Sequence, residues 1–456
     1  MGKFRLFGLQ TDEISDREIK HRKLAREVAS EGMVLLKNEG ILPLQPQKIA
    51  LYGAGARMTV KGGTGSGNMQ ERYSVTIEEG LINAGFEIVS GRWLERFDES
   101  FAKEKEEWRL GIEEKIKHYK PWEVQKMFDE VIHVMPLRFP IGDLIQETDI
   151  SAETDTAIYV IARQAGESAD RKLEKGDYYL SEVEEKNLSF LADKYKKILL
   201  VINCGGILDM SVLDKVQGIG AVLHFVQGGE EGGNAFADVV TGKVTPSGKL
   251  TDTWARDYED YPCAKDFGAL GDVLNQDYKE GVYVGYKWYE TADQEGYFND
   301  KTLTYNVLQE NGNKVQETKT GYDAVVKYPF GYGLSYTEFE WELESFTSTT
   351  ENITKDTVFN YEINVTNVGS RKGKDVVELY ITPPYTKGGI EKSHVNLVDY
   401  AKTSLLRPGD SETIELSFKP YDFASYDDYD KNSNGFKGYE LESGEYIVSI
   451  RTDAHN

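Results

Sequence analysis

Four short, uninterrupted apolar runs constrain the fold more than any other feature of this sequence. They span residues 49–52, 156–161, 198–202 and 219–225. A strand with one face in water alternates apolar and polar residues, whereas these runs do not, so both faces of their sheet must be covered. A helix-like segment at 181–195 separates the second and third runs, and another at 230–240 follows the fourth. The alternation predicts a mostly parallel sheet covered by helices, an α/β sandwich.

Two helix starts carry the same local signature. Ser15 with Glu18, and Ser181 with Glu184, each form the pair expected of a capping box, in which side chain and backbone satisfy each other's hydrogen bonds. We therefore predict helices over 15–36 and 181–195.

A highly charged, helix-compatible segment at 92–150 interrupts the α/β rhythm. We interpret it as a helical insertion whose charges form a solvated face, with a partner-binding surface as the alternative.

The pattern changes after about residue 345. Residues 357–365 alternate with a period of two, and residues 376–381 and 445–451 are also strand-like. Turn signals such as Pro383-Pro384 separate the runs. Short strands at this spacing predict an immunoglobulin- or fibronectin III-like β-sandwich. The predicted domains are therefore 1–345 and 346–456.

Composition excludes several function classes. The chain has 77 acidic and 53 basic residues, a net charge of −24, which disfavours nucleic acid and membrane surfaces as partners. Two cysteines, Cys204 and Cys263, and six scattered histidines match neither a disulfide framework nor a metal site. We predict no metal and no cofactor. The start of the chain lacks the apolar core of a signal peptide, and no apolar run could span a bilayer, so we predict a cytoplasmic location.

Two loops could carry chemistry. The glycine-rich loop 53–67 follows a strand, but its spacing fits neither G-x-G-x-x-G nor a P-loop, so a nucleotide site is the weaker interpretation. The second loop, 165–181, follows the run 156–161, and ligands gather at the carboxyl ends of such strands. Its charged residues fit either a solvated loop with an internal Asp–Arg pair or a carboxylate that donates a proton.

Two further glycine-rich segments have a structural interpretation. Residues 226–254 are typical of tight turns around a helix. Residues 327–341 are rich in aromatic side chains and favour an interdomain packing strip, with sugar stacking as the alternative.

Six motifs together resemble glycoside hydrolase family 3. They are AREVASEGMVLLKNEGILPL (25–44), GGTGSG (62–67), AGESADR (165–171), GGEEGGNAFADVVTGKVTPSGKLTDTW (228–254), EGVYVGYKWYET (280–291) and YPFGYGLSYTEF (328–339), in the family's order. The resemblance covers nearly the whole chain and implies a retaining, exo-acting β-glycosidase such as a β-glucosidase. It also implies that the tail is the family's fibronectin type III-like domain.

The resemblance implies roles for particular residues. Glu167 matches the family's general acid/base, with Asp170 and Arg171 beside it. Gly63 and Ser66 match the loop near the site mouth, so we expect these four neighbours to contact substrate. The implied substrate is a β-linked glucoside or oligosaccharide.

One departure limits this expectation. The family normally carries a (β/α)₈ barrel that supplies the aspartate nucleophile, and about 200 residues are needed for one. None fits here, so the chain resembles the leading portion of the subgroup whose barrel comes last. We expect a barrel domain either elsewhere in the same polypeptide or on a partner chain. We also predict a homo-oligomer, and little activity from this chain alone. The alternatives are a non-catalytic carbohydrate- or protein-binding module and, third, a nucleotide-binding protein.

Overall fold

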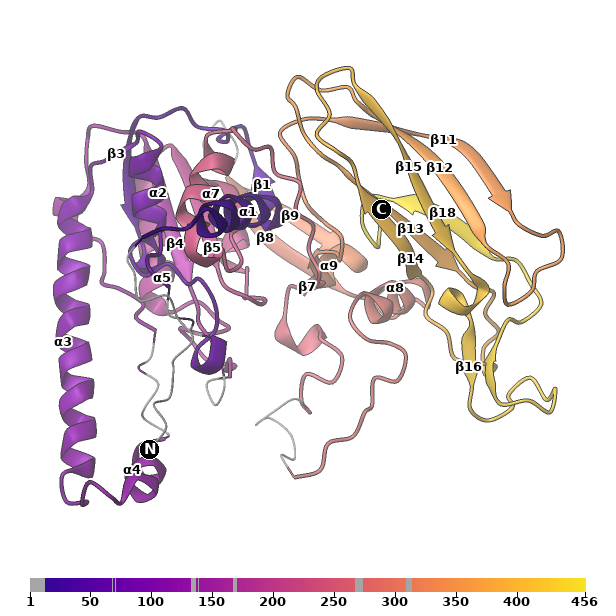
Figure 1. The fold of residues 1–456 in the computed structure, drawn as a ribbon, viewed down its shortest axis with the longest axis horizontal. Coiled ribbons are helices and arrows are strands. Elements are labelled where there is room, and N and C mark those ends of the chain that lie inside the picture. The colour runs from indigo at the N-terminus through magenta and orange to yellow at the C-terminus, as the bar shows by residue number, and fades with distance from the viewer. Residues whose placement is uncertain are drawn as a thin grey trace.

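The fold comes from a computed structural model that describes residues 13–67, 69, 71–132, 137, 139–166, 170–266, 274–308 and 314–456. An α/β part and a β-sandwich lie side by side (Figure 1). This arrangement confirms the predicted fold class.

A six-stranded sheet forms the centre of the α/β part, in the order β1-β6-β5-β4-β2-β3. Its strands are β1 (Val34–Asn38), β2 (Lys48–Tyr52), β3 (Glu87–Ile88), β4 (Thr156–Ala162), β5 (Lys197–Asn203) and β6 (Ile219–His224). All neighbours pair in parallel except β1, which runs antiparallel to β6 at the edge. The four apolar runs of the sequence are β2, β4, β5 and β6.

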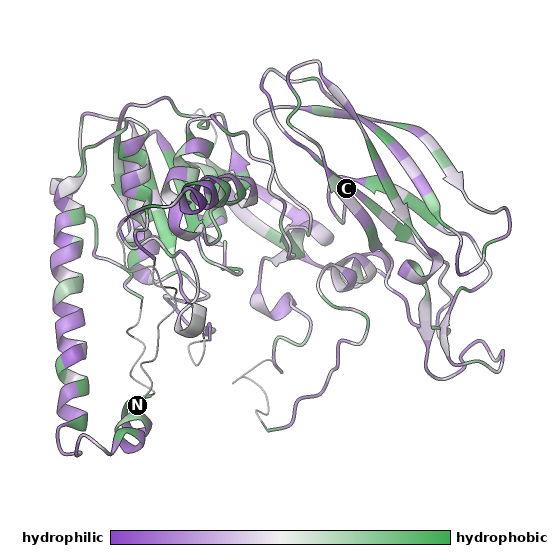
Figure 2. Ribbon diagram, viewed as in Figure 1, coloured by the Kyte–Doolittle hydropathy of each residue, from purple (hydrophilic) through white to green (hydrophobic). Residues whose placement is uncertain are grey.

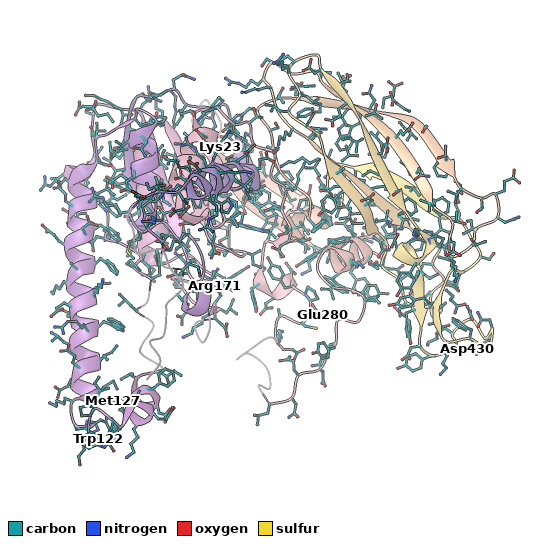
Figure 3. All side chains as sticks on the ribbon, viewed as in Figure 1. Lys23, Trp122, Met127, Arg171, Glu280 and Asp430 are labelled. Carbon is teal, nitrogen blue, oxygen red and sulfur yellow. The ribbon has the colours of Figure 1, made fainter. Side chains whose placement is uncertain are left out.

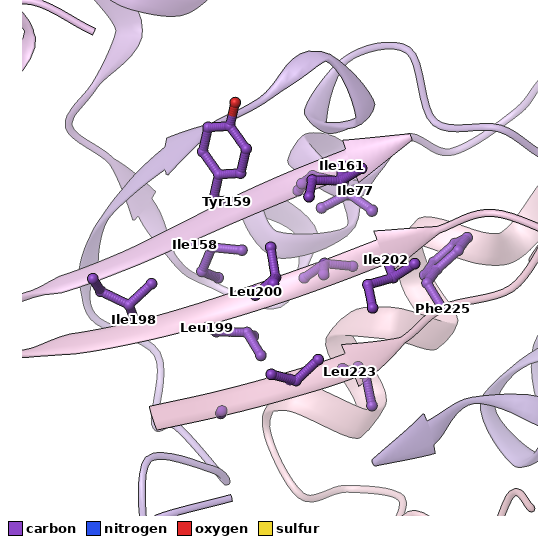
Figure 4. Packing of buried hydrophobic residues seen from close by; sticks show 14 of the residues in the cluster. Ile77, Ile158, Tyr159, Ile161, Ile198, Leu199, Leu200, Ile202, Leu223 and Phe225 are labelled. Carbon is purple, nitrogen blue, oxygen red and sulfur yellow. The ribbon is translucent and has the colours of Figure 1, made fainter. Parts of the chain in front are cut away.

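The buried strands explain why these runs are continuous. Every residue of β4 and of β6 is buried. Leu199 and Leu200 of β5 are both fully buried although successive side chains of a strand point to opposite faces. Figure 4 shows these side chains packing on both sides of the sheet against residues such as Ile77.

Helices cover the sheet. They are α2 (Ile77–Asn83), α5 (Glu182–Lys194), α6 (Val212–Lys215) and α7 (Gly232–Val240), and α1 (Asp16–Gly32) packs on α7. Both predicted capping boxes are present, Ser15 with Glu18 on α1 and Ser181 with Glu184 on α5. Gly242 follows α7 with a φ of 73°, a conformation that glycine adopts without strain.

The predicted helix 15–36 is too long. α1 ends at Gly32, Met33 is already extended, and β1 begins at Val34. Apolar residues at 33–36 continue the helical spacing of α1, but β1 pairs with β6 and all four of these residues are at most 2% exposed. Tertiary pairing therefore decides the conformation of this short run.

The charged segment between β3 and β4 forms α3 (Gly91–Ile116) and α4 (Val124–Val131). Only the first turns of α3 pack on the sheet, through Trp93, Leu94 and Phe97. The remainder forms a long column at one side of the molecule, and its surface is predominantly hydrophilic (Figures 1 and 2).

Short elements link the two parts. They are β7 (Trp254–Ala255), α8 (Tyr286–Gln294), the hairpin β8 (Thr302–Leu308) with β9 (Lys314–Thr320), α9 (Tyr322–Val325) and β10 (Val326–Tyr328), which pairs with β7. Single 3₁₀ turns occur at Ala54–Ala56, Gly65–Gly67, Glu147–Asp149, Gly229–Glu231, Tyr258–Asp260 and Pro420–Phe423.

The β-sandwich consists of antiparallel strands. One sheet is β11 (Phe339–Ser348), β12 (Phe359–Asn367) and β15 (Ser411–Phe418). The other is β14 (Asn396–Lys402), β13 (Val376–Thr382) and β18 (Ile447–Arg451), and a small ribbon joins β16 (Ser425–Asp427) to β17 (Gly438–Glu440). The predicted division at 345/346 falls within β11. The domain boundary itself stays a prediction.

A helix that could span a membrane is not found in the described part of the chain.

Candidate active site

The loops that follow β2 and β4 meet at the carboxyl edge of the sheet. Thr64 and Gly166 form a parallel β-bridge, and the Thr64 amide donates to the carbonyl of Ala165 at 2.9 Å. A side chain at Gly63 would bring its Cβ within 3.0 Å of that same carbonyl. The glycine-rich loop is therefore pressed against the segment that immediately precedes position 167.

Asn203, at the end of β5, ties a third loop to this edge. Its amide group donates to the carbonyls of Val60 and Val226, both at 2.8 Å, while its carbonyl oxygen accepts from the Val60 amide at 2.6 Å. Asn203 is fully buried. One side chain therefore satisfies backbone groups of the loops after β2 and β6, which a buried polar group of this kind must do.

The far end of the loop after β4 is held by Asp177. One of its carboxylate oxygens accepts from Arg171 Nε and the other from the Lys172 amide at 2.7 Å. Arg171 Nη1 also points at the Sγ of the buried Cys204, 2.8 Å away. The internal Asp–Arg pair of the sequence hypothesis is thus Asp177 with Arg171, and Figure 3 shows Arg171 on this loop.

A buried ion pair between the end of β4 and α5 also holds this loop. Arg163 donates to both carboxylate oxygens of Glu184, at 2.8 and 2.7 Å, and its Nε donates to the Asp177 carbonyl at 2.9 Å. Burial opposes the charge of Arg163, but the adjacent Glu184 outweighs it and holds the pKa of the guanidinium above its ordinary value. Glu184 also completes the capping box of α5, so one carboxylate connects the helix, the strand end and the loop.

The structure describes some of the predicted site residues and not others. Glu167 lies outside the described residues. The backbone of Ser66 belongs to the 3₁₀ turn at Gly65–Gly67, but its side chain is not described. Asp170 is exposed, whereas Arg171 is folded inward to Asp177. Gly63 lies beside Ala165. The structure thus brings Gly63 to the segment before position 167 and Arg171 to the segment after it.

Within the described ranges, two buried polar atoms at this edge find no hydrogen-bond partner. They are the Oγ1 of Thr64 and the Nη2 of Arg171. Such groups are costly to leave unpaired, and functional sites are where they are tolerated.

Sequence reasoning missed Asn203 and Arg163. Glu184 was noticed as a capping residue, but nothing in the sequence shows that it also pairs with Arg163. In the described part of the chain, no group of three or more His, Cys, Asp or Glu side chains could hold a metal ion.

Comparisons with known proteins place this geometry in a family. The model of the glycosyl hydrolase family 3 C-terminal domain matches residues 33–286, a range that contains every predicted site residue. The chain belongs to glycosyl hydrolase family 3. A fibronectin type III-like domain model matches residues 375–454, so the tail is also as the resemblance implied.

The family 3 relatives include several β-glucosidases. The chain is 34% identical to β-glucosidase A of Butyrivibrio fibrisolvens, over 96% of this chain and 50% of that protein. It is 32% identical to a β-glucosidase of Ruminococcus albus, over 95% of this chain and 39% of that protein. The chain therefore spans half or less of the length of these two relatives.

Solved family 3 structures agree with the fold. A β-glucosidase from Paenibacillus barengoltzii superposes with a TM-score of 0.73 at 30% identity, over 95% of this chain and 42% of that one. β-Glucosidase 3B from Thermotoga neapolitana, solved in complex with α-D-glucose, gives a TM-score of 0.70 at 31% identity, over 97% of this chain and 53% of that one.

Proposed function

We propose that this chain is the acid/base-bearing part of a retaining, exo-acting β-glycosidase that removes terminal sugars from β-glucosides or β-linked oligosaccharides. The observation that supports this most is the match of the family 3 model to residues 33–286, together with β-glucosidases among the relatives. The substrate, the barrel partner and the role of Glu167 are parts of the proposal.

The described residues suit a proton donor at position 167. The backbone before it is bridged to Thr64, and the backbone after it is held by Asp177 through Arg171 and Lys172. A general acid must reach its oxygen with little positional freedom. The described backbone on each side of position 167 is thus tied to other segments, which is what a positioned general acid requires.

The chemistry needs a second carboxylate. Retaining glycosidases place two carboxyl groups about 5–5.5 Å apart, one to attack the anomeric carbon and one to protonate the leaving oxygen and later activate water. We assign the second role to Glu167 and the first to a (β/α)₈ barrel in cis or in trans. A free glutamate has a pKa of about 4.3, so a neighbouring carboxylate and burial across the domain cleft are needed to keep the acid protonated near neutral pH.

The test is reconstitution. The chain is mixed with a separately expressed family 3 barrel, and hydrolysis of an aryl β-glucoside is measured. We expect little turnover from the chain alone, turnover from the mixture, and a loss of about 10²–10⁴-fold with Glu167→Gln, the range that general acid/base catalysis supplies. Glu182→Gln, on the exposed first turn of α5, is the matched control.

A second measurement separates catalysis from folding. With Glu167→Ala and a substrate whose leaving group needs no protonation, azide should restore turnover, because it attacks the glycosyl-enzyme without base assistance. Turnover by the purified chain alone that Glu167→Gln abolishes contradicts the division of labour. Failure of azide to restore turnover contradicts the role of Glu167.

The alternative is a non-catalytic carbohydrate- or protein-binding module derived from such an enzyme. It predicts that the mixture stays inactive although the chain still binds the barrel or a β-glucan in a calorimeter.

A further inference from the structure

The β-sandwich meets the α/β part along a seam that contains several buried ionisable groups. We define the seam by residues from four places in the chain. They are Phe330 and Gly331 of the connector between β10 and β11, Glu378 and Tyr380 of β13, residues 453–456 after β18, and Glu290 of α8. The Ala454 amide donates to the Phe330 carbonyl at 2.8 Å across it. On the same side, the Leu397 amide of β14 donates to the hydroxyl of Tyr286 at 3.0 Å.

Glu378 lies at the centre of the seam. The residue is only 4% exposed, and its Oε2 accepts a hydrogen bond from the Tyr380 hydroxyl at 2.6 Å. The carboxylate packs directly on the connector, since a Cβ at Gly331 would lie 2.5 Å from Oε2 and 2.9 Å from Oε1. Glycine at 331, with a φ of 85°, is therefore what lets the two parts close over this acid.

His455 joins the seam to α8. Its Nδ1 lies 2.9 Å from Oε2 of Glu290, which is 5% exposed, and Glu290 Oε1 accepts from the Tyr322 hydroxyl at 2.6 Å. The His455 ring also stacks on Tyr322, with ring centroids 3.6 Å apart. A protonated imidazole in this place forms an ion pair between the end of the sandwich and α8, one of the elements that link the sandwich to the α/β part.

Other charges face these two groups. Lys249 approaches from the α/β part and donates to the carbonyls of Gly333 and Thr452, at 3.2 and 3.4 Å. Asp375 and Asp453 face Glu378 from the sandwich. The further groups that face His455 or the neighbouring His394 are Asp293, Glu295 and Arg451.

We propose that the seam is a proton-sensitive joint, in which the sandwich is held to the α/β part more firmly when Glu378 and His455 carry protons than when both have lost them. Deprotonation places a negative charge on Glu378 in a site from which water is excluded, and it removes the positive charge that pairs His455 with Glu290. Both changes weaken the same contact. The proposal does not depend on the role of Glu167.

The direction of the pH effect follows from the two groups. Burial raises the pKa of Glu378 to about 7, against the opposing Tyr380 hydrogen bond and Lys249. Burial opposes protonation of His455, but Glu290 raises its pKa overall. A raised pKa in the folded state means stability that is present at low pH and lost as pH rises through that value. Burial lowers the pKa of His394, so protonation of His394 destabilises the fold below about pH 6.5, opposite to the effect of Glu378 and His455. The pH dependence of the seam is therefore clearest between pH 6 and 8.

The experiment measures hydrogen exchange of the Ala454 amide, the donor that crosses the seam, in the whole chain between pH 6 and 8, with exchange rates corrected for the pH dependence of free peptides. A shift of the Glu378 pKa from 4.5 to about 7 predicts about tenfold loss of protection over this range from Glu378 alone. Amides within β5 should keep constant protection.

Variants identify the groups. Glu378→Gln should flatten most of the pH dependence, because the amide resembles the protonated acid, and His455→Gln should remove the remainder. Tyr380→Phe should move the transition to higher pH, since the lost hydrogen bond favours the ionised acid. Glu415→Gln, on the exposed face of β15, is the matched control. Protection that does not vary with pH, or an unchanged transition in both Glu378→Gln and Tyr380→Phe, overturns the proposal.

Discussion

The carboxyl edge of the sheet and the outer turns of α3 both hold arginine–carboxylate pairs, but the two regions use them differently. Arg163 and Glu184 are 5% and 2% exposed, whereas Arg109 on α3 is 48% exposed and its partners Glu106 and Glu113 are each 55% exposed. In the first region the pair fixes three chain segments in place. In the second it lies on a helix surface in water. The two regions contain the same kind of ion pair, so burial determines whether the pair holds chain segments in place.

The largest expected effect tests the buried side of this comparison. Glu184→Ala leaves the Arg163 guanidinium buried without its partner, and breaking a buried pair in this way costs about 3–5 kcal/mol. We expect a large fall in the urea midpoint of the α/β part with an unchanged slope. Glu182→Ala, two residues earlier and 65% exposed at the side chain, is the control and should stay near the parent. Equal midpoints for the two variants contradict the contrast.

A smaller effect is expected at Asn203. Its replacement by Ala leaves the Val60 amide and the carbonyls of Val60 and Val226 without a partner, and unsatisfied buried groups cost about 1–3 kcal/mol each before the structure relaxes. We expect a loss of about 2–3 kcal/mol in urea unfolding, together with faster proteolysis of the loop after β2. Asn306→Ala, at an exposed position of β8, provides the baseline. Unaltered proteolysis of that loop would contradict the role of Asn203 as its anchor.

How much of the fold the sequence predicts depends on whether a pattern is local. Continuous apolar strands and capping boxes are local, and both were confirmed, as in β4 and at Ser181. The strand β1 was missed because its residues fit a helical pattern equally well. Only pairing with β6, which the local sequence does not show, makes them a strand. The hairpin of β8 and β9 was also missed. β8 does alternate apolar Leu303, Tyr305 and Val307 with polar residues, a period-two signal that was overlooked, whereas β9 has Val315 as its one apolar residue and gives no such signal.

The candidate site divides in the same way. Family motifs located the loops, and the charged residues of 165–181 predicted an Asp–Arg pair. They did not show that Asp177, rather than the adjacent Asp170, would be the partner of Arg171. Asn203 and Arg163 act through residues far away in sequence, so no spacing rule could identify them. The role of Glu167 stays a prediction.

The smallest expected effect tests the exposed side of the comparison. Arg109→Ala removes both contacts to Glu106 and Glu113, yet the side chains are solvated, salt screens them, and two long side chains regain freedom when the pair is lost. We expect a urea midpoint within measurement error of the parent, at low and at high salt. A midpoint loss that approaches that of Glu184→Ala would show that α3 is covered by another surface in solution. The charged face of the insertion would then be a docking surface, which is the alternative interpretation of this segment.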